Sequence, residues 1–417
     1  MQSFYYCSDH LYCEETSIAK VAEKVGTPLY IYSRRALEEQ YRAFDAAFSG
    51  VDHLVCYAVK ANSNLALLNL FAGMGSGFDV VSGGELYRAL RAGATGQRLI
   101  YAGVGKTAAE IDYALQANIL FFSVESEAEL EVIAARARAL KRIARISLRV
   151  NPNVDARTHP YISTGLQKHK FGINLPHALK LYHRARSIKG VRIVGVSCHI
   201  GSQITSIEPF VAAVSKIRRL VERLKSEGIP LRYLDLGGGL GITYRDETPP
   251  ALGEYAAALI SGARGLDCTL VFEPGRVIVG NAGILVTQIL YSKTNTSKKF
   301  IIVDAGMNDL IRPSLYGSFH EIWPIQRRTG PKITADVVGP VCESADFLAK
   351  DRRLQKPLAG DLLSVMSSGA YGFALASNYN SRPRPPEVLV DGRTIQIIRT
   401  RETYADLIRG EQLMTEA

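Results

Sequence analysis

Eight short apolar runs alternate with helical patterns between residues 54 and 273, and this alternation restricts the fold of the 417-residue chain more than any other feature. The runs cover residues 54–59, 77–81, 98–102, 119–124, 143–150, 191–200, 231–236 and 268–273. Amphipathic stretches separate them, among them residues 85–92, 108–117, 127–140 and 209–227. Eight strand-helix repeats predict a parallel (β/α)8 TIM barrel of the α/β class. An open, doubly wound sheet is the alternative.

The pattern changes after residue 280. Strand-like runs with turn signals and little helix follow at residues 284–291, 299–303, 332–338, 361–366 and 387–390. Such a series predicts a separate all-β domain. We therefore expect a barrel at residues 27–280 and a β-sandwich or β-barrel domain built from residues 1–26 and 281–417.

Composition excludes several classes of protein. Hydrophobic residues make up 47% of the chain, and no apolar run reaches the roughly 18 residues that span a membrane. No secretory pattern opens the sequence, so we expect a cytoplasmic protein. Six cysteines without a C-x-x-C pair favour reduced thiols and predict no bound metal. The net charge is +10, but basic and acidic residues mix along the predicted helices, so we expect no nucleic-acid partner.

Lys60 directly follows the first apolar run, where a charged side chain is unexpected. Barrels gather their active sites at the carboxyl ends of their strands. A partly desolvated lysine at such an end can act as a nucleophile and form a Schiff base with an aldehyde. The alternative is an ordinary lysine whose stem lies along the surface while its ammonium reaches solvent.

A glycine-rich turn follows the seventh run. Gly237, Gly238 and Gly239 leave backbone N–H groups uncovered, which suits a phosphate. The turn lacks the lysine of G-x-x-x-x-G-K-[ST] and the spacing G-x-G-x-x-G, so a simple phosphate cup is preferred over a nucleotide site. A tight strand-to-helix turn is the alternative.

The sixth and eighth runs also end in polar residues. Glu273 and Arg276 flank a Pro-Gly turn that contains Gly275, and either a ligand site or an ion pair within the turn would explain them. His199, followed by Ser202, could stack on a bound ring or be a histidine of the core. A lysine, a phosphate cup and a carboxylate at one barrel mouth together describe a site for pyridoxal 5'-phosphate.

Six segments carry a family resemblance that extends over nearly the whole chain. They cover residues 57–62, 199–203, 237–239, 273–276, 342–344 and 369–372. Their sequences resemble the motifs of diaminopimelate decarboxylases. The resemblance implies fold-type III architecture, with an alanine-racemase-like barrel and a β-sandwich. It also implies a homodimer with active sites shared across its interface.

The resemblance implies a role for each matching residue. Lys60, His199 and Cys342 would be catalytic, with Lys60 bonded to the cofactor, His199 stacked on its ring and Cys342 protonating Cα from across the dimer interface. The other cofactor-binding residues would be Ser202, Gly237, Gly238, Gly239, Glu273, Gly275, Arg276 and Tyr371. The substrate-binding residues would be Arg276, Arg312, Tyr316, Glu343 and Tyr371. For Cys342 the alternative is a buried structural thiol, and for Arg312 a surface ion pair.

The substrate follows from the charges that its far end would meet. Arg312, Tyr316 and Arg276 suit a distal carboxylate, and Glu343 suits a distal ammonium. A substrate with both groups is meso-2,6-diaminopimelate, which yields L-lysine and CO2. A carboxynorspermidine decarboxylase and a catalytically inactive, partner-binding homologue are the rivals. Residues 151–170 form a long loop after the fifth run, which we expect to be a lid.

Overall fold

A computed structural model describes residues 3–156, 164–165, 170–296 and 298–414. The chain forms two compact units. One unit contains Met1–Glu39 and Val279–Ala417, and the other is the intervening segment Gln40–Ile278. In the described part of the chain, no helix is both long enough and apolar enough to cross a membrane.

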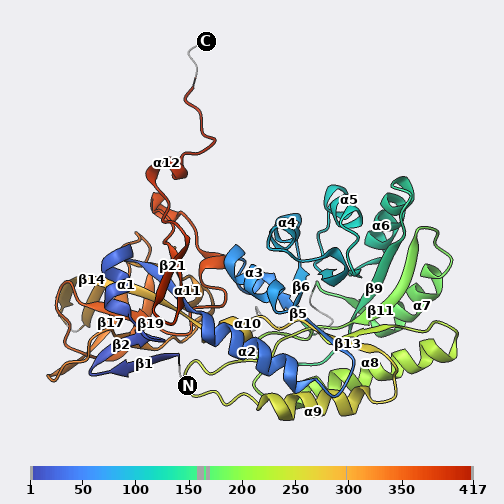
Figure 1. Cartoon of the computed structure of the whole chain (residues 1–417), viewed down its shortest axis with the longest axis horizontal. Coiled ribbons are helices and arrows are strands. Elements are labelled where there is room, and N and C mark those ends of the chain that lie inside the picture. The colour runs from blue at the N-terminus through green and yellow to red at the C-terminus, as the bar shows by residue number, and fades with distance from the viewer. Residues whose placement is uncertain (1–2, 157–163, 166–169, 297, 415–417) are drawn as a thin grey trace. The chain divides into compact units, whose positions relative to one another are not determined.

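The intervening unit is a closed barrel of eight parallel strands (Figure 1). In ring order they are β5 (His53–Ala58), β6 (Gly77–Val80), β7 (Leu99–Tyr101), β8 (Phe121–Val124), β9 (Ala144–Asn151), β11 (Val191–Ser197), β12 (Tyr233–Asp235) and β13 (Thr269–Phe272). The pairing of β13 with β5 closes the ring, and the two-residue strand β10 (Ile173–Asn174) adds to β9. Each of the eight strands overlaps a predicted run, so the TIM barrel is confirmed and the open sheet is wrong.

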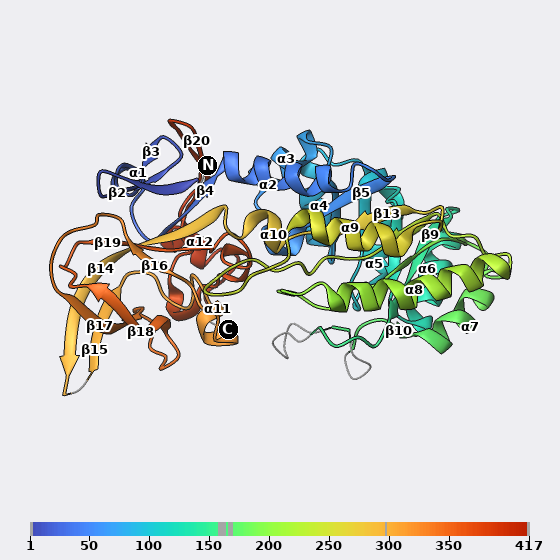
Figure 2. The ribbon, with the colours of Figure 1, turned by 90° about the horizontal axis from the view of Figure 1, so that it is seen from below.

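Helices cover the outside of this ring (Figures 1 and 2). They are α3 (Leu65–Gly73), α4 (Gly83–Arg91), α5 (Ala108–Gln116), α6 (Glu127–Ala139), α7 (Leu175–Ala185), α8 (Glu208–Ser226) and α9 (Leu252–Ala263), with α2 (Arg34–Ala47) and α10 (Arg276–Val279) at the ends of the unit. Local capping explains where several begin. Ser82 accepts a hydrogen bond from the Glu85 backbone at the start of α4, and Thr107 forms a capping box with Glu110 at the start of α5. After each of these helices the chain returns to the next strand of the ring.

The other unit is rich in β-structure. Its strands are β1 (Phe4–Cys7), β2 (His10–Cys13), β3 (Thr16–Ser17), β4 (Leu29–Ser33), β14 (Gly283–Asn295), β15 (Lys298–Val303), β16 (Ile322–Pro324), β17 (Lys332–Val338), β18 (Phe347–Gln355), β19 (Leu362–Val365), β20 (Glu387–Asp391) and β21 (Thr394–Arg399). The first three form a small sheet and the other nine a larger one. Three short helices, α1 (Ile18–Val25), α11 (Arg312–Tyr316) and α12 (Tyr404–Leu407), and single turns at Phe373–Leu375 and Tyr379–Ser381 accompany them.

Strand β4 ties the amino end of the chain to this sheet. It pairs antiparallel with β14 and parallel with β20, so it lies inside the sheet rather than at its edge. Residues 27–39 had been predicted to open the barrel, whereas the compact unit that contains β4 extends to Glu39. The difference arises because β4 finds its partners more than 250 residues further along the sequence.

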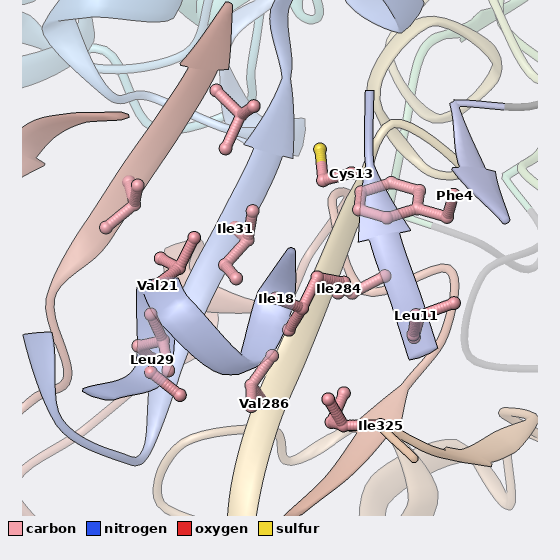
Figure 3. Packing of buried hydrophobic residues seen from close by; sticks show 13 residues of the cluster. Phe4, Leu11, Cys13, Ile18, Val21, Leu29, Ile31, Ile284, Val286 and Ile325 are labelled. Carbon is pink, nitrogen blue, oxygen red and sulfur yellow. The ribbon is translucent and has the colours of Figure 1, made fainter. Parts of the chain in front are cut away.

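A hydrophobic core joins the elements of this unit (Figure 3). Leu29 and Ile31 of β4 pack with Ile284 and Val286 of β14, and α1 contributes Ile18. All five side chains are fully buried. Burying each such side chain is worth about 1.5–3 kcal/mol relative to leaving it in water, which explains why the two distant chain segments form one unit.

Candidate active site

Lys60 lies in a single 3-10 turn, Val59–Ala61, that directly follows β5. Its Nζ donates a hydrogen bond of 2.5 Å to Oδ2 of Asp79, a fully buried residue of the neighbouring strand β6. The lysine side chain is about one third exposed, at 34%. The ammonium group is therefore held by a buried carboxylate at the carboxyl end of the barrel strands and does not simply extend into solvent.

Glu85 is a second carboxyl group beside this pair. Its Oε2 accepts a hydrogen bond of 2.8 Å from the Val81 backbone N–H. Burial raises the pKa of Glu85 to about 7, although the Val81 bond and the positive charge of Lys60 act in the opposite direction. This part of the barrel mouth therefore offers a group that gains and loses its proton near neutral pH.

The glycine-rich turn after β12 is packed tightly against its neighbours. Gly237 and Gly239 have φ angles of 66° and 114°, which side chains disfavour. A Cβ atom at Gly238 would lie 2.1 Å from the Glu273 carbonyl oxygen. Packing alone therefore requires glycine here, as the tight-turn interpretation expects. The N–H groups of Gly237 and Gly238 donate to the side chains of Asp235 and His199, so they do not form an open phosphate cup.

Glu273 follows β13 and is 9% exposed. Its backbone N–H donates to the Gly237 carbonyl oxygen at 2.7 Å, which fixes the ends of β12 and β13 against each other. Burial raises the pKa of the Glu273 carboxyl well above its usual range, and the negative charges of Asp235 and Asp79 add to this shift. Glu273 therefore binds its proton unusually tightly.

His199 lies two residues beyond β11. Its Nδ1 accepts a hydrogen bond of 3.2 Å from the Gly238 backbone N–H, which places the ring proton of the neutral form on Nε2. Burial lowers the pKa of His199 well below its usual value, and the positive charges of Arg149 and Lys60 lower it further. The imidazole is therefore neutral at physiological pH and held beside the glycine turn.

Arg276 begins α10 and is 6% exposed. Its guanidinium donates to the Tyr244 hydroxyl at 2.6 Å and to the Ser202 hydroxyl at 3.1 Å. A Cβ atom at Gly275 would lie 2.9 Å from the Cβ of Ala61, so this turn also packs beside Lys60. The predicted barrel residues thus meet at the ends of β5, β11, β12 and β13: Lys60, His199, Ser202, Gly237, Gly238, Gly239, Glu273, Gly275 and Arg276.

The remaining predicted residues belong to the β-rich unit. Arg312 opens α11, is 4% exposed and donates to the Ser318 hydroxyl at 3.2 Å. The interpretation of Arg312 as a surface ion pair is therefore wrong. Tyr316 ends the same helix and is half-buried, and Tyr371 adopts a φ angle of 55°, which is rare for a residue with a side chain.

Cys342 and Glu343 lie next to each other on an exposed loop. The Cys342 backbone N–H donates to Oδ1 of Asn380 at 2.8 Å, and Oε2 of Glu343 accepts a hydrogen bond of 3.2 Å from the Tyr379 hydroxyl. Because Cys342 is exposed, the interpretation of a buried structural thiol is wrong. All six cysteines are described, and none is bonded to another.

Asp346 organises the loop that carries these two residues. Its two carboxylate oxygens accept hydrogen bonds of 2.6 Å each from the backbone N–H groups of Met307 and Val341. Ser314 of α11 donates to the Ala345 carbonyl oxygen at 2.5 Å. The loop with Cys342 and the helix with Arg312 are thereby connected within the β-rich unit.

Several polar residues of the barrel mouth were not predicted from the sequence. They are Asp79, Glu85, Asp235, Tyr244 and the ion pair of Arg149 with Glu125, whose closest atoms are 2.7 Å apart. A carboxylate inside an otherwise apolar run was a usable signal for Asp79 and Asp235. The predicted lid, residues 151–170, falls largely on residues 157–163 and 166–169, which lie outside the described residues.

The family model described as "Pyridoxal-dependent decarboxylase, pyridoxal binding domain" matches residues 34–280. The chain belongs to this family of pyridoxal-dependent decarboxylases, and its cofactor is pyridoxal phosphate.

Individual relatives narrow the comparison. The chain is 50% identical over 416 residues to a protein of Pseudomonas aeruginosa named diaminopimelate decarboxylase, and 51% identical over 418 residues to one of Vibrio cholerae with the same name; each comparison covers 100% of both chains. The crystal structure of diaminopimelate decarboxylase from Helicobacter pylori complexed with L-lysine has a TM-score of 0.91 and 45% identity, covering 94% of this chain and 98% of that chain. The resemblance predicted from the sequence motifs is confirmed.

Proposed function

We propose that the chain removes one carboxylate from meso-2,6-diaminopimelate and releases L-lysine and CO2, the last step of lysine biosynthesis. The observation that carries the proposal is the meeting of an amine, a glycine turn and a buried carboxyl at one barrel mouth: Lys60, Gly237 to Gly239, and Glu273. Relatives that match the full chain are named for this activity. Such a biosynthetic reaction would take place in the cytoplasm.

The residues present fit pyridoxal phosphate. Lys60 would bind the aldehyde. The glycine turn, through the Gly239 N–H, would bind the phosphate together with Arg276 and Ser202. His199, which is neutral and flat, would lie against the ring. Glu273 would bond to the ring nitrogen, and Tyr371 would complete the site. The bound cofactor supplies an electron sink for the pair released when the carboxylate leaves.

The far end of the substrate would meet charged and polar side chains. Arg312, Tyr316 and Arg276 would bind the distal carboxylate through charge-assisted hydrogen bonds, and Glu343 would bind the distal ammonium. The burial of Arg312 supports this, because a buried guanidinium discriminates strongly between an anion and a neutral group. Tyr371 would also contact substrate.

Cys342 would deliver the proton that Cα needs after CO2 has left. In this proposal Cys342 and Glu343 act on the active site of the partner subunit of a homodimer. Their exposure on a loop supports a role at such a shared site. An isolated monomer should then be inactive.

The test is CO2 release by the purified, cofactor-loaded protein from meso-diaminopimelate, ornithine, arginine and carboxynorspermidine, measured in parallel. We expect a clear preference for diaminopimelate. Preference for carboxynorspermidine would replace the substrate but leave the cofactor site intact. No release from any of the four would favour the inactive, partner-binding homologue.

Arg312→Ala tests the distal site directly. We expect KM for diaminopimelate to rise at least about tenfold, because a charge-assisted hydrogen bond is lost, while cofactor binding stays unchanged. The control is Arg328→Ala, which removes an exposed arginine of the same unit that pairs with Asp361. Equal loss of substrate and cofactor binding in Arg312→Ala would contradict the assignment.

A further inference from the structure

Asp235 is a buried carboxyl group at the barrel mouth that the proposed chemistry leaves without a role. It ends β12 and is 1% exposed. Its Oδ1 accepts a hydrogen bond of 2.9 Å from the Gly237 backbone N–H, at the start of the glycine turn. With the carboxyl ionised, its buried Oδ2 receives no hydrogen bond from the described part of the chain. An unsatisfied carboxylate oxygen in such a place costs free energy, so a proton is expected nearby.

The nearest source of that proton is Glu273. Strands β12 and β13 run parallel, and Asp235 pairs with Val271, two residues before Glu273. Residues two apart on a strand share a face, so both carboxyl groups project from the same side of the sheet. Contacts with Glu273 and with the Ser197 hydroxyl lower the pKa of Asp235, so in the ligand-free chain both groups donate to its carboxylate and the shared proton lies on Glu273. Ser197 in turn bonds to Ser147 at 2.6 Å, which completes a buried polar row across four strands.

Two adjacent buried carboxyl groups do not both ionise readily, because each charge raises the pKa of the other. Burial raises the pKa of Asp235 to about 7, and that of Glu273 lies well above its usual range. The other titratable and charged groups around the pair are Asp79, Lys60, Arg149, His199, Cys56 and Cys198. Lys60 and Arg149 offset only part of the negative charge that three ionised carboxyl groups would carry. The pair of Asp235 and Glu273 therefore keeps at least one proton at neutral pH.

We propose that Asp235 is a positioning residue that acts through Glu273: when Glu273 gives up its proton and faces the ring nitrogen as a carboxylate, Asp235 holds a proton on Oδ2 and donates it in a hydrogen bond to that carboxylate. This inference rests on the proposed role of Glu273 toward the ring nitrogen of the cofactor. One proton then lies on Asp235 and one on the ring nitrogen, with the Glu273 carboxylate between them. Because Asp235 also bonds to Gly237, the same side chain fixes Glu273 relative to the glycine turn.

Two substitutions separate the hydrogen bond from the charge. Asp235→Asn keeps an oxygen for the Gly237 N–H and supplies an amide N–H to Glu273, but it cannot ionise. Asp235→Ala removes both contacts. The control is Ser197→Ala, which removes a buried hydroxyl beside Asp235 but leaves Glu273 with its partner.

The measurements use the cofactor-loaded protein: kcat as a function of pH, and protonation of the ring nitrogen by 15N NMR with labelled pyridoxal phosphate. We expect Asp235→Asn and Ser197→Ala to stay within about threefold of wild type at pH 7, with a protonated ring nitrogen. Asp235→Ala should lower kcat about ten- to hundredfold and shift the 15N signal toward the unprotonated form. Any fall in the wild-type kcat that comes from ionisation of Asp235 at higher pH should be absent from Asp235→Asn.

Equal kcat and equal 15N signals in Asp235→Asn and Asp235→Ala would overturn the proposal, as would an unchanged high-pH fall in Asp235→Asn. Melting temperatures of all variants identify a loss that comes only from unfolding. Glu273→Gln distinguishes the proposed role of Asp235 from the proposed role of Glu273 toward the ring nitrogen. If Glu273→Gln keeps normal kcat and a protonated ring nitrogen, the role of Glu273 itself is wrong. If Glu273→Gln loses kcat and the protonated ring nitrogen while both Asp235 variants match wild type, only the role of Asp235 is wrong.

Discussion

Several cations of the barrel unit lie directly beside a buried carboxylate. Lys60 faces Asp79, and Arg149 faces Glu125. Lys106 has no exposed side-chain surface, and its Nζ lies 2.7 Å from Oε1 of Glu129. Removing one member of a buried pair costs about 3–5 kcal/mol, because the other charge stays behind uncompensated. For any substitution in one of these pairs, activity and stability must therefore both be measured.

Lys60 can be tested with two substitutions that differ in charge. Lys60→Arg keeps a cation beside Asp79 but cannot form a Schiff base, whereas Lys60→Ala removes both properties. We expect both variants to lose turnover and the visible absorbance of the bound cofactor, and Lys60→Ala alone to melt at a markedly lower temperature. Lys180→Ala, on the exposed side of α7, is the control. Retained visible absorbance in Lys60→Arg would mean that another lysine binds the cofactor.

Cys342→Ala separates proton delivery from cofactor binding. The visible absorbance should be unchanged, since Cys342 belongs to the loop of the β-rich unit, but kcat should fall by roughly a hundredfold or more, the usual contribution of a positioned acid. Steady-state kinetics together with an absorbance spectrum check this. Cys7→Ala removes another exposed thiol and should behave as wild type. Turnover close to wild type in Cys342→Ala would remove the proton-donor assignment.

At the scale of elements, the glycine turn after β12 needs residues without side chains both for its packing and for its proposed contact with the phosphate. Gly238→Ala would put a Cβ atom 2.1 Å from the Glu273 carbonyl oxygen, so β12 and β13 would have to move apart. We expect a loss of more than about 1 kcal/mol of stability and weaker cofactor binding, measured by denaturant unfolding and by spectral titration. Gly253→Ala in α9 is the matched control, because its added Cβ meets nothing within 4 Å. Equal stability of the two variants would show that the turn has more room than its geometry indicates.

Asp346 connects the loop of Cys342 with the segment before α11. Asp346→Ala removes two hydrogen bonds to a charged group, and we expect a loss of roughly 3 kcal/mol or more in the stability of this unit. The cofactor absorbance should persist while kcat falls, because the loop that presents Cys342 loses its anchor. Thermal unfolding and kinetics measure the two effects. The control is Glu321→Ala, which removes an exposed acidic residue of the same unit. If Asp346→Ala has the same kcat as this control, the anchoring role of Asp346 is wrong.

Local patterns predicted some elements and missed others for a physical reason. The eight barrel strands were recognisable because each is apolar, short and followed by a helix, and the helices α3 to α7 begin at a side-chain cap. Strands β4, β18 and β21 were not predicted, since each depends on partners that only the folded sheet supplies. The run Leu29–Ser33 reads as β-structure or as the lead into a helix until its pairing with β14 is known.

At the scale of the whole molecule, buried carboxyl groups make stability depend on pH. Burial raises the pKa values of Asp235, Glu85 and Asp309 to about 7 each. An acid whose pKa is higher in the folded state than in the unfolded chain stabilises the fold at low pH. That contribution is lost as the pH rises from about 4 through 7.

Asp309→Asn isolates one of these contributions. Asp309 accepts a hydrogen bond of 2.8 Å from the Gly306 backbone and one of 3.0 Å from the Asn308 amide, which can turn over to receive a donor instead. We expect the melting temperature of Asp309→Asn to rise relative to wild type as the pH increases from 5 to 8, because only the wild type must ionise a buried acid. A difference that does not change with pH would show that Asp309 is ionised throughout.

The candidate site was more predictable than its surroundings. Lys60, the glycine turn and Glu273 stand out in one sequence because each breaks an apolar pattern at a strand end. Asp79 and Asp235 break the same pattern, but a carboxylate within a strand gives no sign of which cation or carboxyl it will face. The burial of Arg312 and the exposure of Cys342 depend on tertiary packing and could not be inferred from composition or spacing.

The insertion of the barrel between the two halves of the β-rich unit has a consequence for synthesis on the ribosome. The whole of Gln40–Ile278 is synthesised before β14 and β20. The barrel can therefore fold while β4 is still unpaired. During that interval β4 is an apolar, unpaired strand on a nascent chain, open to chaperones and to pairing with the wrong segment. A chain that stops near residue 280 would keep this exposure permanently, so premature termination should yield insoluble protein rather than a free barrel.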